Sequence, residues 1–62
     1  MTATETIVVA RAKAFSTEGI REHKFLVGQD SVRVWDSVAG YYTTCHSLTA
    51  AAVRRIRRLA RA

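Results

Sequence analysis

Alternating apolar and polar residues predict strands over the first two thirds of this chain and a helix at its end. Residues 6–15, TIVVARAKAF, are rich in β-branched side chains and partly alternate, as strands do. Val8, Ala10, Ala12 and Ala14 would share one face of this strand, because successive side chains point to opposite sides. This face of small residues suits close packing against a helix, whereas the other face mixes apolar and basic side chains.

Two more strands are predicted at Ile20–Val27 and Val32–Trp35. The tetrapeptide GQDS between them predicts a tight hairpin, since Gly28 and Asp30 are typical turn residues between β-rich segments. After a further turn, YYTT at Tyr41–Thr44 is predicted to form a short fourth strand.

The last third predicts an amphipathic helix. Ser47 is placed to cap its N-terminus, and the alanines that follow favour helix strongly. With about 100° per residue, one continuous arc of the helix is apolar. The residues expected to dock on the rest of the protein are Leu48, Ala52, Ile56 and Leu59. The opposite arc holds Arg54, Arg57, Arg58 and Arg61, and Arg55 flanks the apolar edge.

Together these elements predict the α+β class, with a small antiparallel sheet of three to four strands followed by one C-terminal amphipathic helix. We expect a single domain over residues 1–62, with a disordered leader at 1–5, a β-rich part at 6–46 and the basic helix at 47–61.

The small size of the chain predicts a homodimer. A domain of 62 residues buries only about 60% of the surface that its unfolded chain exposes, and small domains usually add disulfides, a metal or a partner subunit. A single cysteine, Cys45, excludes an internal disulfide, and metal ligands are few. The lone cysteine also favours the cytoplasm, and no apolar segment approaches the length of a membrane span.

The net charge of +5 lies entirely in the last quarter of the chain. Residues 1–46 balance their charges, whereas residues 47–62 contain five arginines and no acidic residue. Like-charged neighbours on one helix face repel each other, a cost that a polyanion would relieve. Arginine also binds phosphate and guanine in a bidentate manner, which lysine does not do.

We therefore predict a protein that binds nucleic acid, with double-stranded DNA favoured over RNA, in a regulatory role. The expected primary contacts are Arg54, Arg57, Arg58 and Arg61, supported by Arg55, Arg33 and Lys13. A β-ribbon in the major groove, carrying Arg11, Lys13 and Arg33, is an alternative arrangement. Other interpretations are a protein-interaction module whose basic helix docks on an acidic partner, and a helix face that is merely solvated.

A phosphate site is also conceivable ahead of the helix, where the first turn lacks an acidic residue. Backbone N–H groups there could hold a phosphate together with the hydroxyls of Thr43, Thr44, Ser47 or Thr49. The simpler alternative assigns Ser47 to the helix cap and the two strand threonines to the sheet. Both interpretations use the same residues.

The remaining candidate residues predict no enzyme, no cofactor and no metal site. Cys45 lies beside His46, and His23 is the other imidazole, but their spacing matches no metal motif. An inert thiol in the core is the expected role of Cys45. Trp35 and Tyr41 or Tyr42 could stack on bases, but strand aromatics in a small protein usually belong to the core or to a dimer interface.

The segment Val32–Ala60, VRVWDSVAGYYTTCHSLTAAAVRRIRRLA, resembles a family of small bacterial proteins that are often encoded on plasmids and other mobile elements. The specific part is YYTTCHSL at Tyr41–Leu48, which corresponds to a YTTCHSL signature before a basic C-terminal helix. The resemblance implies a dimeric, DNA-binding or regulatory protein without an established active site. Ribbon-helix-helix repressors are a poor match, since that fold has one strand followed by two helices.

Overall fold

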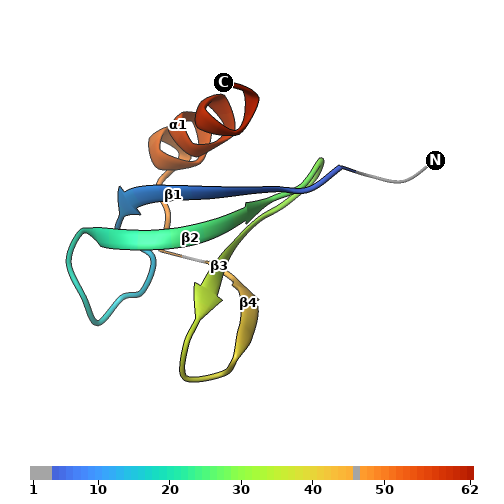
Figure 1. Cartoon of the computed structure of the whole chain (residues 1–62). Helices are drawn as coiled ribbons and strands as arrows, with labels where there is room; N and C mark the ends of the chain where they lie inside the picture. Colours follow the sequence, from blue (N-terminus) through green and yellow to red (C-terminus); the bar gives the residue numbers. More distant parts are fainter. Residues whose placement is uncertain (1–3, 46) are drawn as a thin grey trace.

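Four antiparallel strands and one helix make up the fold in our computed structural model, which describes residues 4–45 and 47–62 (Figure 1). The elements are β1 (Thr6–Ala12), β2 (Arg21–Val27), β3 (Val32–Asp36), β4 (Tyr41–Thr44) and α1 (Ala50–Arg61). The strands form one sheet in the order β1-β2-β3-β4, with every neighbouring pair antiparallel. The predicted α+β class, with its short fourth strand and C-terminal helix, is therefore confirmed.

The sheet consists of two arms that meet at the β2–β3 hairpin. β1 and β2 pair along their whole length, from Thr6 opposite Val27 to Ala12 opposite Arg21. β2 and β3 pair only at Phe25–Val27 with Val32–Val34. Beyond this short ladder, β3 diverges from β2 and continues with β4 as a second arm (Figure 1).

The predicted turns have identifiable hydrogen bonds. At the β2–β3 hairpin, the Gly28 N–H donates to the Ser31 carbonyl at 2.8 Å. At the β3–β4 turn, Asp36 Oδ1 accepts hydrogen bonds from the backbone N–H groups of Val38 and Ala39 at 3.0 and 3.1 Å. Gly40 ends this turn with φ of 81°, a left-handed conformation that favours glycine.

The core lies between α1 and one face of the sheet, chiefly at β1 and β2. Its buried residues are Val8, Ala10, Ala12, Ala14, Phe25, Val27, Val34 and Ile56. The predicted small face of the first strand is confirmed, because its valine and three alanines are all buried. Alanine side chains allow a close approach of the helix, so that Ile56 is fully enclosed.

Two predicted details of the helix are wrong. It begins at Ala50 rather than at residue 47, and Thr49 is its N-cap: its Oγ1 accepts the Ala52 N–H at 3.1 Å. Leu59 was expected to dock but is 45% exposed, whereas Ala60 packs against the core. The physical reason is the rotation of the helix, which places Ile56 at the centre of the contact and Leu59 at its margin.

Only one face of the sheet is covered by the helix. The register assigns Ile7, Val9 and Leu26 to the opposite face, together with Arg33 and Trp35. We call this second surface the open face. Of its apolar side chains, Val9 is 58% exposed and Trp35 is 37% exposed, so the prediction of Trp35 as a core residue is wrong.

Because Ile56 is the largest side chain that the helix buries, trimming it should weaken the whole fold. We expect Ile56→Val to lower the free energy of unfolding by about 0.5–1.5 kcal/mol and Ile56→Ala by about 2–5 kcal/mol. Leu59→Ala, at the exposed margin, should cost less than about 1 kcal/mol. Urea denaturation followed by circular dichroism measures these differences. Equal losses at Ile56 and Leu59 would contradict the assigned helix rotation.

Candidate nucleic-acid interface

The five arginines of α1 separate into two groups according to their position around the helix. On the helical wheel, Arg55 and Arg57 flank the apolar arc on its two sides. Both donate hydrogen bonds to backbone carbonyls outside the helix. Arg55 Nη2 donates to the Arg11 carbonyl at 2.6 Å, on the strand that lies at the edge of the sheet.

Arg57 joins the helix to the β2–β3 hairpin. Its side chain is half-buried, and Nη1 donates to the Gly28 carbonyl at 3.0 Å and to the Gln29 carbonyl at 3.4 Å. The sequence placed Arg57 among the primary nucleic-acid contacts, with Arg55 in support. The structure instead gives both guanidinium groups partners within the protein, where they hold α1 against the sheet.

The other three arginines, Arg54, Arg58 and Arg61, form an exposed row along α1. We call them the arginine row. They lie at positions i, i+4 and i+7 and extend over about 10 Å of helix axis. In the part of the chain that the structure describes, the ion pairs within 4 Å involve only Glu18, so no carboxylate neutralises the row. The row therefore presents three positive charges to the solvent.

Arg33 and Lys13, predicted as supporting contacts, do not join the arginine row. Arg33 lies on the open face, on the side of the sheet opposite the helix, and Lys13 is exposed just beyond the end of β1. The predicted alternative of a basic sheet face is met in part, since Arg11 and Arg33 do share the open face. Lys24 also lies on that face, although the sequence analysis did not single it out. Alternation along β2 was the signal that could have found it, because Lys24 falls on the side opposite the buried Phe25 and Val27.

The four hydroxyls predicted as phosphate contacts do not converge. The register places Thr43 opposite Val34 on the helix side of the sheet and Thr44 opposite Arg33 on the open face. The hydroxyl of Thr49 accepts the Ala52 N–H as the helix cap. Ser47 is half-buried two residues before this cap. The structure therefore assembles no hydroxyl cluster at the start of α1.

Cys45 and His23 each have a partner within the protein. The thiol of Cys45 is half-buried against the core and donates to the Ala14 carbonyl at 2.8 Å. His23 Nε2 lies 3.1 Å from Glu18 Oε2. His46 lies outside the described residues. Among the residues that are described, no group of three or more His, Cys, Asp or Glu side chains could hold a metal ion.

Comparisons with protein-family models, curated proteins and solved structures found no match to this chain. The resemblance of Tyr41–Leu48 to the plasmid-borne family therefore stays a prediction. No helix within residues 4–45 and 47–62 is long and apolar enough to cross a membrane.

The two groups of arginines should differ in their effect on stability. Arg57→Ala removes hydrogen bonds from a charged donor to two carbonyls, and we expect a loss of about 1–2 kcal/mol. For a domain of this size, each kcal/mol corresponds to about 4–8 °C in Tm. Arg58→Ala should change stability by less than about 0.5 kcal/mol, because its side chain is solvated. Thermal unfolding of both variants tests this; equal effects would show that Arg57 is not a structural contact.

Proposed function

We propose that this protein binds double-stranded DNA through the arginine row of α1 and acts in a regulatory role in the cytoplasm. The supporting observation is the exposed row Arg54, Arg58 and Arg61, which has no neutralising carboxylate among the described residues. Exposed guanidinium groups at this spacing repel each other in the free protein. A polyanion that binds to the row relieves this repulsion.

The dimensions of the row suit the backbone of a duplex. A row about 10 Å long corresponds to roughly three base pairs along one strand, at about 3.4 Å per nucleotide. Each guanidinium group can contact a phosphate, and a bidentate contact to guanine would add sequence preference. The helix carries no aromatic side chain on which an unpaired base could stack. This favours a duplex over a single strand as the ligand of α1.

Charge reversal in the row should weaken binding strongly, and charge reversal at an exposed cation outside the row should not. For three phosphate contacts per protomer, the affinity of the wild type should fall with salt at a log–log slope of about −2.7. We expect Arg54→Glu/Arg58→Glu to weaken binding at least tenfold and to flatten this slope. Fluorescence anisotropy with a labelled duplex in a salt series measures both quantities, and circular dichroism verifies the fold.

The control for this experiment is Lys13→Glu, which reverses an exposed charge just beyond the end of β1. The affinity of Lys13→Glu for the duplex should remain within about twofold of the wild type after correction for net charge. A larger loss for Lys13→Glu than for the double variant would place the site away from α1. Equal affinity of the wild type for the duplex and for heparin would contradict a regulatory role, since charge alone would then explain binding.

A further inference from the structure

The open face carries aliphatic side chains that nothing in the described chain covers. Ile7 and Leu26 are direct register partners on β1 and β2, and Val9 is the next residue of β1 on the same face. Ile7 is 52% exposed and Val9 is more exposed still. Aliphatic side chains have neither a π-face for bases nor a donor for phosphates, so this corner of the sheet suits another apolar surface.

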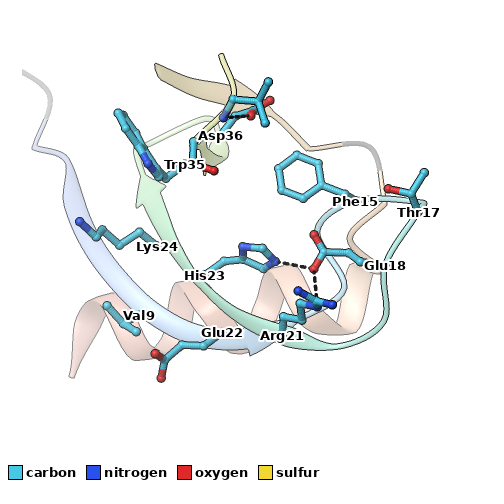
Figure 2. A pocket seen from close by; sticks show the side chains of 12 residues that line it. Val9, Phe15, Thr17, Glu18, Arg21, Glu22, His23, Lys24, Trp35 and Asp36 are labelled. Atoms are coloured by element: carbon cyan, nitrogen blue, oxygen red, sulfur yellow. Dashed lines mark hydrogen bonds and ion pairs between the residues drawn. The ribbon is translucent and has the colours of Figure 1, made fainter. Parts of the chain in front are cut away.

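A groove continues this apolar corner toward the second arm of the sheet. Where β3 diverges from β2, a hollow of about 750 Å³ opens, shown in Figure 2. The side chains that matter for a partner are Val9, Phe15, Lys24, Trp35 and Val38. Trp35 packs edge-on against Tyr42 with ring centroids 5.1 Å apart, and Val38 at the β3–β4 turn is 97% exposed.

The core of the chain is thin, since three of its eight buried residues are alanines. A domain of 62 residues buries only about 60% of the surface that its unfolded chain exposes. Small domains usually gain further burial from disulfides, a metal or a partner subunit, and the exposed aliphatic side chains of the open face are available to a partner subunit.

We propose that the open face is a homodimer interface, on which a second copy of this chain packs sheet against sheet about a two-fold axis. Both copies then bury Ile7, Val9 and Trp35, and every contact occurs twice. A nucleic acid is a poorer occupant, because three carboxylates, those of Glu18, Glu22 and Asp36, line the groove. The dimer leaves both helices on the outside and holds whether or not α1 binds DNA.

The charges of the open face give the dimer a characteristic salt dependence. Counted together with the groove, the face carries four cations, Arg11, Arg21, Lys24 and Arg33, against three carboxylates, Glu18, Glu22 and Asp36. Two copies therefore bring together surfaces of net positive charge, and salt screens their repulsion. The dimer should become tighter as salt rises, whereas binding to a polyanion becomes weaker.

Sedimentation equilibrium of the full chain tests the interface. We expect the wild type to dimerise, with a dissociation constant that decreases between low and high salt. Val9→Lys places a cation in the apolar corner, and the dissociation constant should rise by about 100-fold. The control is Leu59→Lys, which adds the same charge at a partly exposed apolar position of α1 and should leave the dimer intact. Circular dichroism verifies that both variants fold.

Trp35 provides a second measurement, since it is the only tryptophan of the chain. Its emission should shift to shorter wavelength as the wild type dimerises, and it should stay unshifted in Val9→Lys at the same concentration. A wild type that stays monomeric at millimolar concentration overturns the proposal, as does a Val9→Lys variant that dimerises like the wild type. Quenching of Trp35 by a single-stranded oligonucleotide would also overturn it, because the open face would then bind nucleic acid.

Discussion

The contact of Ile56 with the alanine-rich face of β1 determines the arrangement of the rest of the molecule. Small side chains at Ala10 and Ala12 let α1 lie close to the sheet, and the fully buried Ile56 determines which way the helix is turned. With this rotation, Arg55 and Arg57 reach backbone carbonyls on either side of the contact. The same rotation directs Arg54, Arg58 and Arg61 into the solvent. Packing thus separates structural arginines from those available to a ligand.

A single helix can cover only one face of the sheet, so the molecule has two unlike surfaces. The helix side presents the arginine row, and the opposite side presents exposed aliphatic and aromatic residues with Lys24 and Arg33 among them. In the proposed dimer the two arginine rows would lie on opposite outer surfaces and point away from each other. Such an arrangement would allow one dimer to contact two DNA segments, one at each helix.

Local patterns in the sequence were sufficient for the class of fold and for the buried face of the first strand. Alternation of Val8, Ala10 and Ala12 identified the buried side of β1, and the glycine and aspartate of GQDS identified the hairpin. Both features depend on neighbouring residues alone. The helix was also predicted, although its start was not, since Ser47 and Thr49 are both good N-caps and only the path of the chain after Cys45 distinguishes them.

Features that depend on contacts between distant segments were not predictable in the same way. Arg57 differs from Arg58 only because the Gly28 and Gln29 carbonyls lie within reach of one and not of the other. The position of Arg57 beside the apolar arc on the helical wheel indicated that its side chain could contact the rest of the protein. The carbonyls that it contacts could not be identified, because they lie about 28 residues away in the chain. Likewise, Trp35 is exposed because it lies on the sheet face that the single helix leaves uncovered, and no local pattern specifies which face the helix covers.

The separation of the arginines is tested most directly by NMR of their side chains. In ¹H–¹⁵N spectra, the guanidinium Nη–H signals of Arg55 and Arg57, which donate to backbone carbonyls, should exchange slowly with solvent in the free protein and change little when duplex DNA is added. The signals of Arg54, Arg58 and Arg61 should exchange rapidly and then shift as the duplex binds. Shifts that concentrate on Arg33 and Trp35 instead, or rapid exchange at Arg57, would contradict this account.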